Sequence, residues 1–210
     1  MNNLKDKFSA QDVEIVERQS SYRGFLKIDK LLLKHKLVLG GWSKVMPREV
    51  LLKESAVAVL LFDPKRQEVV LVRQFRVGML GEPQNPWLVE LVAGMIEKGE
   101  SPEDVARRES EEEADCSPKQ LKEICNYYSS PGTTSERVYL FCGQVDSGDA
   151  GGVFGLDSEH EDIEVVVMPV LEFHQAVESG QINNAMTIIA SYWLEKHGKS
   201  LSQEWLGGDS

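Results

Sequence analysis

The sequence predicts an α/β protein in which a small antiparallel β segment precedes a larger region of strands and helices. The 210 residues are 41% hydrophobic, which is enough for one medium-sized domain with or without a small appendage. The composition shifts near Ser55, where short apolar runs give way to longer β-rich runs. Helical patterns then appear after Ser101, so both element types belong to the larger region.

Residues 1–54 form the predicted small β domain. Apolar runs at Phe25–Ile28 and Leu31–Leu33 alternate with polar residues, and Gly40-Gly41 signals a turn, a pattern typical of antiparallel strands. A segment of this size cannot bury a core of its own. We therefore expect it to pack either on the rest of the chain or on a second subunit.

The larger predicted domain covers residues 55–210. Its first two strands, at 56–62 and 69–75, are joined by the turn residues Asp63–Arg66. A helix should begin after Ser101, because Ser is a favoured N-cap, Pro102 suits the first helical position, and acidic residues follow; it should end near Ala114. The remaining predicted elements are strands at 87–92, 124–128, 138–145 and 163–170, and helices at 171–179 and 184 to about 197.

A long polar, Gly-rich stretch at 147–161 interrupts this pattern. Loops of this length in a compact domain are usually functional lids or disordered.

The net charge, the chain start and the cysteine spacing limit the kinds of function that the sequence supports. A net charge of -11 repels nucleic-acid backbones and anionic lipid surfaces, so an anionic substrate would need a metal or local cations. The start of the chain has no apolar signal segment, and no stretch approaches the ~20 apolar residues of a membrane span. Cys116, Cys125 and Cys142 have no zinc-type spacing. We expect reduced thiols and a cytoplasmic protein that binds neither nucleic acid nor membranes.

The predicted helix carries three carboxylates on one side. Glu109, Glu112 and Glu113 stand at i, i+3 and i+4, which places them together at about 100° per residue. Such a face could bind Mg²⁺, which prefers carboxylate oxygens and retains water and phosphate as further ligands. Taken alone, an acidic run more often forms a solvated face.

The wider spacing favours the metal site. The chain contains Gly94, five residues, Glu100, seven residues, Arg108-Glu109, two residues, and Glu112-Glu113. This pattern resembles the signature of the Nudix hydrolases, and the resemblance implies a mixed β-sheet sandwiched between helices. The chain departs from the signature at Ser110 and Cys116, where aliphatic residues are expected, and at Asp115, where glycine is expected. Glycine would end the helix in the left-handed region, which Asp tolerates at some cost.

Further segments resemble the bacterial ADP-ribose pyrophosphatases within that family, although Thr133 replaces a usual glycine. The segments that carry this resemblance are Tyr22–Phe25, Arg48-Glu49, Gln74–Arg76, Pro86–Glu90, Val92–Ile96, Ser130–Arg137 and Glu159–Asp162. The resemblance implies hydrolysis of ADP-ribose to AMP and ribose 5-phosphate, and a homodimer in which the N-terminal sheets are exchanged.

The same resemblance implies the site residues. Two or three Mg²⁺ ions, with Mn²⁺ as a substitute, would be held by the Ala93 carbonyl, Glu109, Glu112, Glu113 and Glu161. The expected catalytic residues are Glu159, Glu113 and Glu109. Glu159 is the expected catalytic base, with Glu136 as the second candidate. The expected substrate-binding residues are Phe25, Arg48, Glu49, Lys53, Arg76, Met95, Ser130, Pro131, Gly132 and Glu136.

Three other functions remain open from the sequence. The chain could be a Nudix pyrophosphatase acting on a GDP-sugar or on NADH, because the base-reading hydrogen bonds are not visible in the sequence. It could be a sensor that binds ADP-ribose without cleaving it, although no helix-turn-helix accompanies the domain. A structural domain with a solvated acidic helix is the third alternative.

Overall fold

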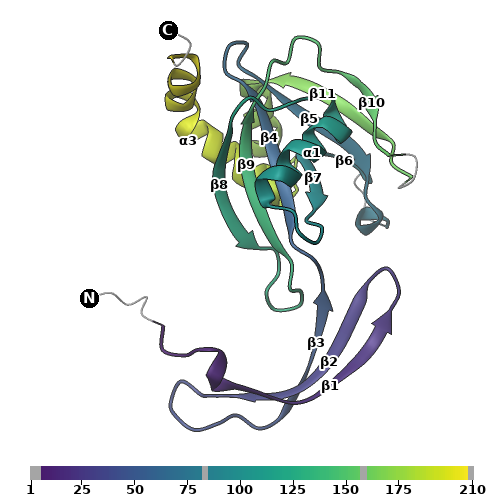
Figure 1. Ribbon diagram of the computed structural model, residues 1–210, viewed down its shortest axis with the longest axis vertical. Coiled ribbons are helices and arrows are strands. Elements are labelled where there is room, and N and C mark those ends of the chain that lie inside the picture. The colour runs from purple at the N-terminus through teal and green to yellow at the C-terminus, as the bar shows by residue number, and fades with distance from the viewer. Residues whose placement is uncertain (1–5, 82–84, 157–159, 208–210) are drawn as a thin grey trace. The chain divides into compact units, whose positions relative to one another are not determined.

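The computed structural model describes residues 6–81, 85–156 and 160–207. It forms two compact units (Figure 1). Unit 1 comprises Met1–Glu54 and Tyr128–Glu136, and unit 2 comprises Ser55–Tyr127 and Arg137–Ser210. The predicted α/β class is confirmed, with a small antiparallel sheet in one unit and a mixed sheet in the other.

Unit 1 is a three-stranded antiparallel sheet in the order β1-β2-β3. Its elements are η1 (Ala10–Asp12), β1 (Val13–Arg23), β2 (Lys27–His35) and β3 (Met46–Leu52). The segment Tyr128–Glu136 joins this sheet through backbone hydrogen bonds: the Leu51 N–H donates to the Thr133 carbonyl (2.8 Å), and the Ser135 N–H donates to the Leu51 carbonyl (3.0 Å). The sequence did not indicate that this loop belongs to the N-terminal unit.

The unit 1 sheet has almost no core. Every residue of β1 is exposed, including Ile15 at 53% and Val16 at 54%. The main buried polar group is Asp29 on β2, whose carboxylate accepts hydrogen bonds from Arg18 and Arg23. This ion pairing ties β1 to β2 where apolar packing is missing.

Unit 2 is built on a mixed eight-stranded sheet. Its main path runs β10-β11-β5-β4-β9-β8, with β6 paired to β5 and β7 paired to β4. The central strand β4 is parallel to β9 and antiparallel to β5 and β7. The strands are β4 (Ala56–Asp63), β5 (Glu68–Phe75), β6 (Trp87–Glu90), β7 (Val92–Met95), β8 (Leu121–Tyr128), β9 (Arg137–Gln144), β10 (Gly152–Phe154) and β11 (Ile163–Pro169).

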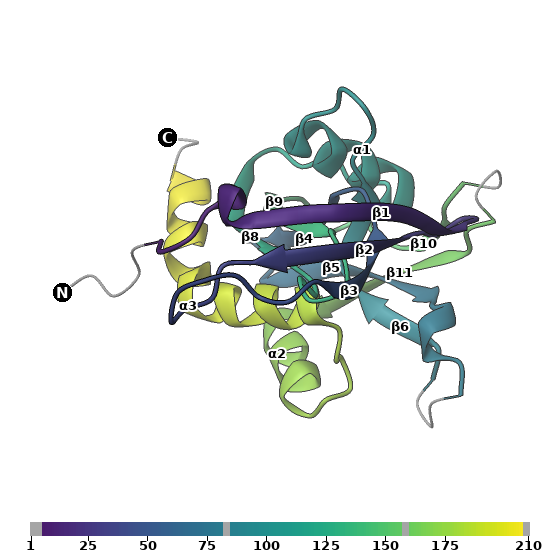
Figure 2. The same ribbon diagram turned by 90° about the horizontal axis from the view of Figure 1, so that it is seen from below.

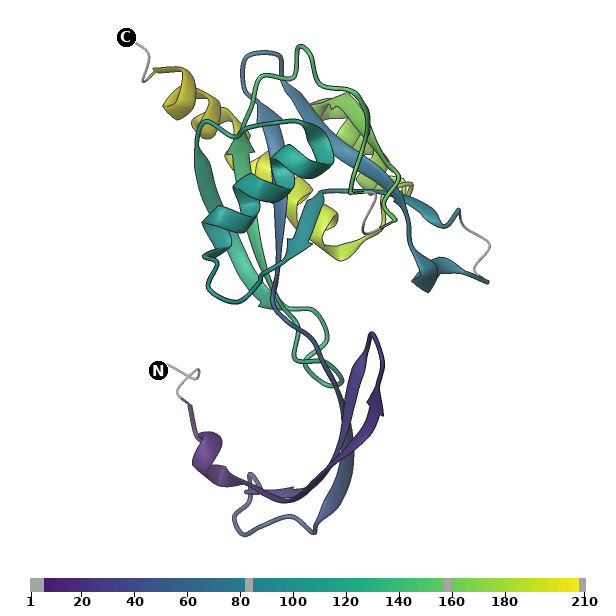
Figure 3. The same ribbon diagram turned by 45° about the vertical axis from the view of Figure 1, so that its right-hand side comes forward.

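Helices cover both faces of this sheet, as Figures 2 and 3 show, with α1 on one side and α2 and α3 on the other. Successive side chains of a strand point to opposite faces, so β4 contributes to two cores. Ala58, Leu60 and Phe62 pack with the residues of α2 and α3, whereas Val57, Val59 and Leu61 pack with those of α1. Because all of these side chains are at most 1% exposed, β4 anchors both layers.

The prediction of one continuous strand at 87–92 is wrong. It is two strands separated at Leu91: β6 pairs with β5, while β7 pairs with β4. The chain changes pairing partner at Leu91, which is fully buried. A largely apolar run of six residues gives no sequence signal for such a change of neighbour.

Two other expectations need correction. The C-terminal helix α3 (Ala185–Gly207) extends well past the predicted end near His197. The reason is that Leu201 and Trp205 continue its buried stripe. The ring centroids of Trp205 and Phe62 lie 6.4 Å apart. The polar stretch at 147–161 contains the short strand β10. No helix in the described ranges is both long and apolar enough to span a bilayer.

Helix α2 (Val170–Glu178) and helix α1 (Pro102–Ala114) follow their predicted ranges closely. At the start of α1, Ser101 and Asp104 cap each other's backbone N–H groups. The helix ends at Asp115, which has φ 50° and ψ 36° in the left-handed region. The unexpected Ser110 is buried and donates to the Ala106 carbonyl (2.6 Å), so its hydroxyl is satisfied within the helix.

Replacing Asp115 with glycine should stabilise the protein. Glycine adopts the left-handed region without the penalty that a Cβ carries, and a negative side chain at a helix C-terminus is unfavourable. Asp115→Ala removes the same charge but keeps the Cβ. We expect Asp115→Gly to exceed Asp115→Ala in unfolding free energy by about 1 kcal/mol, measured by urea denaturation. Equal stabilities would show that the backbone at this position carries no strain.

Candidate functional site

Two of the three predicted carboxylates of α1, Glu109 and Glu113, lie against strand β7. Glu113 is 3% exposed, and its Oε2 accepts a hydrogen bond from the Ala93 N–H at 3.0 Å. The Glu109 side chain is 12% exposed and that of Glu112 is 31% exposed. The carboxylates therefore range from enclosed to accessible along one face of the helix.

Gly94 makes room for Glu109. A Cβ on Gly94 would lie 1.7 Å from Oε1 and 2.0 Å from Cδ of Glu109, far inside van der Waals contact. Any side chain at this position would push the Glu109 carboxylate away from β7. The glycine of the sequence motif is thus required by the close approach of a carboxylate to the backbone.

Arg108 binds the outer carboxylates. Its guanidinium lies 3.0 Å from Glu100, 2.7 Å from Glu109 and 2.9 Å from Glu112. The hydrogen bond from Arg108 holds the pKa of Glu100 below its ordinary value. Arg108 thereby ties the loop before α1 to the acidic face.

Glu161 approaches the same carboxylates from the β10–β11 connection. Its side chain accepts from the Leu156 N–H (3.2 Å), and its own N–H donates to the Leu156 carbonyl (3.3 Å). Gly155, with φ +109°, allows this contact because a Cβ there would lie 2.6 Å from the Glu161 Cβ. Glu159, the expected catalytic base, lies outside the described residues.

Burial and like charge act together on these carboxylates. Burial raises the pKa of Glu113 to about 8, and the charges of Glu109 and Glu161 add to the rise against the opposing Ala93 hydrogen bond and Arg76 charge. Burial also raises the pKa of Glu109, although Arg108 counteracts it. The protein thus holds acidic groups where their ionisation is opposed, and a cation would relieve that opposition.

Arg76 lies at the edge of this cluster, and its Nε donates to Oε2 of Glu90 at 2.6 Å. Glu90 is only 5% exposed and was not among the predicted site residues. The available signal was a single acidic residue in the apolar run from Trp87 to Val92. Met95, a predicted substrate-binding residue, is 51% exposed at the end of β7.

The donor set fits a hard divalent cation. Carboxylate oxygens and a backbone carbonyl are the ligands that Mg²⁺ and Mn²⁺ favour. Across residues 6–81, 85–156 and 160–207, no three His, Cys, Asp or Glu side chains are already gathered closely enough to hold one ion. Glu109 and Glu112 are paired with Arg108, so a cation would replace the guanidinium as their partner.

The remaining predicted residues lie in unit 1. Phe25 stands between β1 and β2 and is 90% exposed. Arg48 and Glu49 lie on β3. Lys53 forms an ion pair with Glu136. Ser130, Pro131 and Gly132 form a turn in which the Ser130 carbonyl accepts from the N–H groups of Thr133 and Thr134, both at 2.9 Å. The predicted residues therefore form one set in each unit.

Glu136 is engaged within unit 1. Burial opposes its ionisation, but hydrogen bonds from Lys53 and Ser129 outweigh burial and place the pKa of Glu136 below its ordinary value. A carboxylate that is ion-paired and has a lowered pKa is a weaker proton acceptor than a free one.

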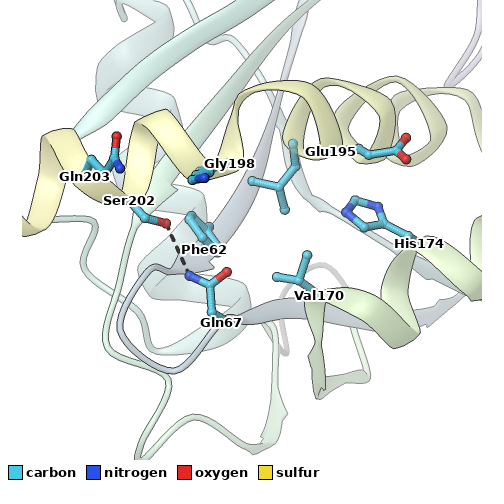
Figure 4. A pocket seen from close by; sticks show the side chains of 10 residues that line it. Phe62, Gln67, Val170, His174, Glu195, Gly198, Ser202 and Gln203 are labelled. Atoms are coloured by element: carbon cyan, nitrogen blue, oxygen red, sulfur yellow. Dashed lines mark hydrogen bonds between the residues drawn. The ribbon is translucent and has the colours of Figure 1, made fainter.

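A cavity of about 510 Å³ lies on the opposite face of the sheet from α1, beside α2 and α3. Figure 4 shows Phe62, Val170 and His174 at its wall. The side-chain amide of Gln67, which lines the cavity, donates a hydrogen bond to the Ser202 hydroxyl at 3.2 Å. The His174 ring is hydrogen-bonded to the Ser191 hydroxyl (2.7 Å). These two side chains are thus paired within the protein, and none of the predicted site residues lines this cavity.

A family model described as the NUDIX domain matches residues 52–186. The chain belongs to the Nudix family. The match covers the whole acidic face of α1, strand β7 and Glu161. Nudix hydrolases generally use divalent metals such as Mg²⁺.

Two of the similar proteins match the chain over nearly its full length, and a third matches most of it. An ADP-ribose pyrophosphatase of Haemophilus influenzae is 46% identical over 201 residues, covering 94% of this chain and 93% of that protein. An ADP-ribose pyrophosphatase of Escherichia coli (strain K12) is 45% identical over 204 residues, covering 97% and 98%. A GDP-mannose pyrophosphatase of Cronobacter sakazakii is 34% identical over 157 residues, covering 72% and 78%.

A solved structure supports the fold. A crystal structure of an ADP compounds hydrolase superposes with a TM-score of 0.67 at 20% identity, covering 91% of this chain and 98% of that chain. At this identity the likeness concerns the fold alone. The expected mixed sheet between helices is therefore confirmed for this Nudix protein.

Replacing Gly94 with alanine should impair the Nudix site without unfolding the protein. The added Cβ collides with the flexible end of Glu109, so the carboxylate rather than the sheet should move. We expect Gly94→Ala to retain the wild-type circular dichroism spectrum and to bind Mn²⁺ at least tenfold more weakly by isothermal titration calorimetry, a loss of about 1.4 kcal/mol.

Gly78→Ala is the matched control, because a Cβ on Gly78 meets no atom within 4 Å. This variant should bind Mn²⁺ like the wild type. Unchanged Mn²⁺ affinity in Gly94→Ala would contradict the role assigned to the Gly94–Glu109 contact.

Proposed function

We propose that this protein is a Mg²⁺-dependent pyrophosphatase that hydrolyses the diphosphate of ADP-ribose to AMP and ribose 5-phosphate, and that of related ADP-sugars to AMP and the corresponding sugar phosphate. The observation that carries the proposal is the enclosed acidic face of α1, where Glu113 is held against β7 although burial opposes its ionisation. The substrate is suggested by the ADP-ribose pyrophosphatases that resemble the chain over 93–98% of their own length.

The Ala93 carbonyl, Glu109, Glu112, Glu113 and Glu161 are the proposed metal ligands. Two or three Mg²⁺ ions, or Mn²⁺ in their place, would neutralise the diphosphate and make bound water more nucleophilic. The protein's own contribution is to hold the ligands. The Ala93 N–H orients Glu113, Gly94 admits Glu109, and Arg108 keeps Glu112 on the same face.

We assign the role of general base to Glu159 rather than Glu136. The pKa of Glu136 is lowered by its hydrogen bonds to Lys53 and Ser129, so this carboxylate is poorly suited to accept a proton from water. Glu136 instead fits a role in holding Lys53 at the substrate. Glu159 lies within the polar stretch at 147–161, and a base carried by such a loop could close over bound substrate.

Unit 1 supplies the proposed adenosine and phosphate contacts. Phe25 exposes a nearly free aromatic ring, which suits stacking on a purine. Arg48, Glu49 and Lys53 offer charged and hydrogen-bonding groups, and the Ser130-Pro131-Gly132 turn exposes its backbone. Arg76 and Met95, in unit 2, are the other proposed substrate-binding residues.

We also propose that the protein is a cytoplasmic homodimer in which the unit 1 sheets are exchanged. Unit 1 exposes apolar side chains along a sheet that has no core of its own, including Ile15 and Val16. A second copy of this sheet could cover them. The proposed ligand is a small nucleoside diphosphate sugar, and neither nucleic acid nor membrane is a proposed partner.

Sedimentation velocity should give twice the mass of one chain. Ile15→Asp places a charge on the exposed apolar face of β1, where burial against a partner would be strongly opposed. We expect this variant to sediment as a monomer. Lys65→Asp, on the exposed turn between β4 and β5, should remain a dimer, and a monomeric wild type would contradict the proposed assembly.

The second candidate is a GDP-sugar pyrophosphatase, favoured by the 34% identity to a GDP-mannose pyrophosphatase. Product release should be measured from ADP-ribose, GDP-mannose and NADH, each with and without Mg²⁺. We expect Mg²⁺-dependent formation of AMP from ADP-ribose with the highest kcat/KM of the three. Preference for GDP-mannose or NADH would discard the adenine assignment, and binding of ADP-ribose without cleavage would indicate a sensor.

Glu113→Gln tests the acidic face in the same assay. The amide keeps the shape of the side chain but cannot supply a negative ligand, so turnover should fall by about three orders of magnitude or more. Glu111→Gln is the matched control, because Glu111 is exposed on another side of the same helix and accepts from the Ser117 hydroxyl. Near-normal turnover in Glu113→Gln would overturn the metal assignment.

A further inference from the structure

Gln74 is a buried polar residue on the α1 face of the central sheet. It lies on β5 and is 7% exposed. Val70 and Val72, on alternate positions of the same strand, pack in the core beneath α1. Because side chains alternate along a strand, Gln74 projects to that same face, toward the end of β5 that leads to Arg76.

Among the residues that the structure describes, none pairs with the side-chain amide nitrogen of Gln74. Nε2 is inaccessible to solvent, and it is the sole buried side-chain nitrogen or oxygen without a partner in the described ranges 6–81, 85–156 and 160–207. Buried polar groups are almost always paired, and an unpaired donor destabilises the folded state. A residue retained at this cost is a candidate for binding an acceptor that arrives from outside.

The residues around Gln74 favour an anionic acceptor. In the pairing of β5 with β6, Gln74 stands opposite Leu88, and Val72 stands opposite Glu90. The nearby Glu90 carboxylate receives the Arg76 guanidinium, so it is already engaged. Arg76 carries the positive charge that would draw an anionic oxygen to this edge of the site.

We propose that Nε2 of Gln74 donates a hydrogen bond to a non-bridging phosphate oxygen of the diphosphate substrate. The inference rests on the proposed function and adds a substrate-binding residue to it. Gln74 binds the oxygen through a neutral donor beside the charged Arg76. The contact forms with any diphosphate in the site and does not distinguish one nucleobase from another.

Gln74→Met separates this role from a structural one. Methionine has a similar length and no hydrogen-bonding amide. If Nε2 forms its hydrogen bond only when substrate is bound, its loss should leave the melting temperature of the free protein unchanged or higher. At the same time KM should rise about tenfold with kcat within about twofold, because a contact present in both ground and transition states affects binding alone.

Gln144→Met is the matched control. Gln144 lies at the end of β9, is 9% exposed, and its Oε1 accepts from Nε2 of Gln120 at 3.0 Å. Removing this satisfied amide should lower the melting temperature and leave KM unchanged. Gln74→Met should thus raise KM without lowering the melting temperature, whereas Gln144→Met should lower the melting temperature without raising KM.

Wild-type enzyme and both variants are to be compared on ADP-ribose, GDP-mannose and NADH. If the wild type cleaves another diphosphate in preference to ADP-ribose, the proposed substrate fails, but the raised KM of Gln74→Met on the preferred substrate still supports the contact. An unchanged KM in Gln74→Met on a substrate that the wild type cleaves overturns the contact. A lowered melting temperature, as in the control, or no cleavage of any diphosphate overturns it as well.

Discussion

The burial of the Glu113 carboxylate between helix α1 and strand β7 is the constraint on which the site depends. The Ala93 N–H holds this carboxylate, while burial raises its pKa to about 8. This rise remains after the Ala93 hydrogen bond and the Arg76 charge have lowered the pKa, and it opposes ionisation by roughly a few kilocalories per mole. The fold therefore maintains an electrostatically unfavourable arrangement that a divalent cation would make favourable.

The central sheet makes that arrangement possible. Strand β4 is buried on both faces and pairs with β7, and α1 packs against this part of the sheet. Gly94 then lets Glu109 approach the backbone of β7. Arg108 gathers Glu100, Glu109 and Glu112 on the outer side, where its positive charge offsets part of the repulsion between the carboxylates.

Local signals predicted helix α1 and its acidic face better than the sheet connections. Ser101, Pro102 and the acidic first turn indicated where α1 begins, and Asp115 adopts the left-handed conformation expected where glycine is usual. The i, i+3, i+4 spacing indicated the common face of the three glutamates. The change of partner at Leu91, the extension of α3 to Trp205 and the unpaired amide of Gln74 depend on contacts between distant residues, for which periodicity carries no information.

The account is tested most directly by crystals grown with Mn²⁺ and measured at the manganese absorption edge. It predicts anomalous peaks at coordination distance, about 2 Å, from carboxylate oxygens of both Glu109 and Glu113. Arg108 should then have released Glu109. Peaks located only elsewhere, with Glu109 still bound to Arg108 and Glu113 bound only to the Ala93 N–H, would contradict the claim that the buried acidic face is a metal site.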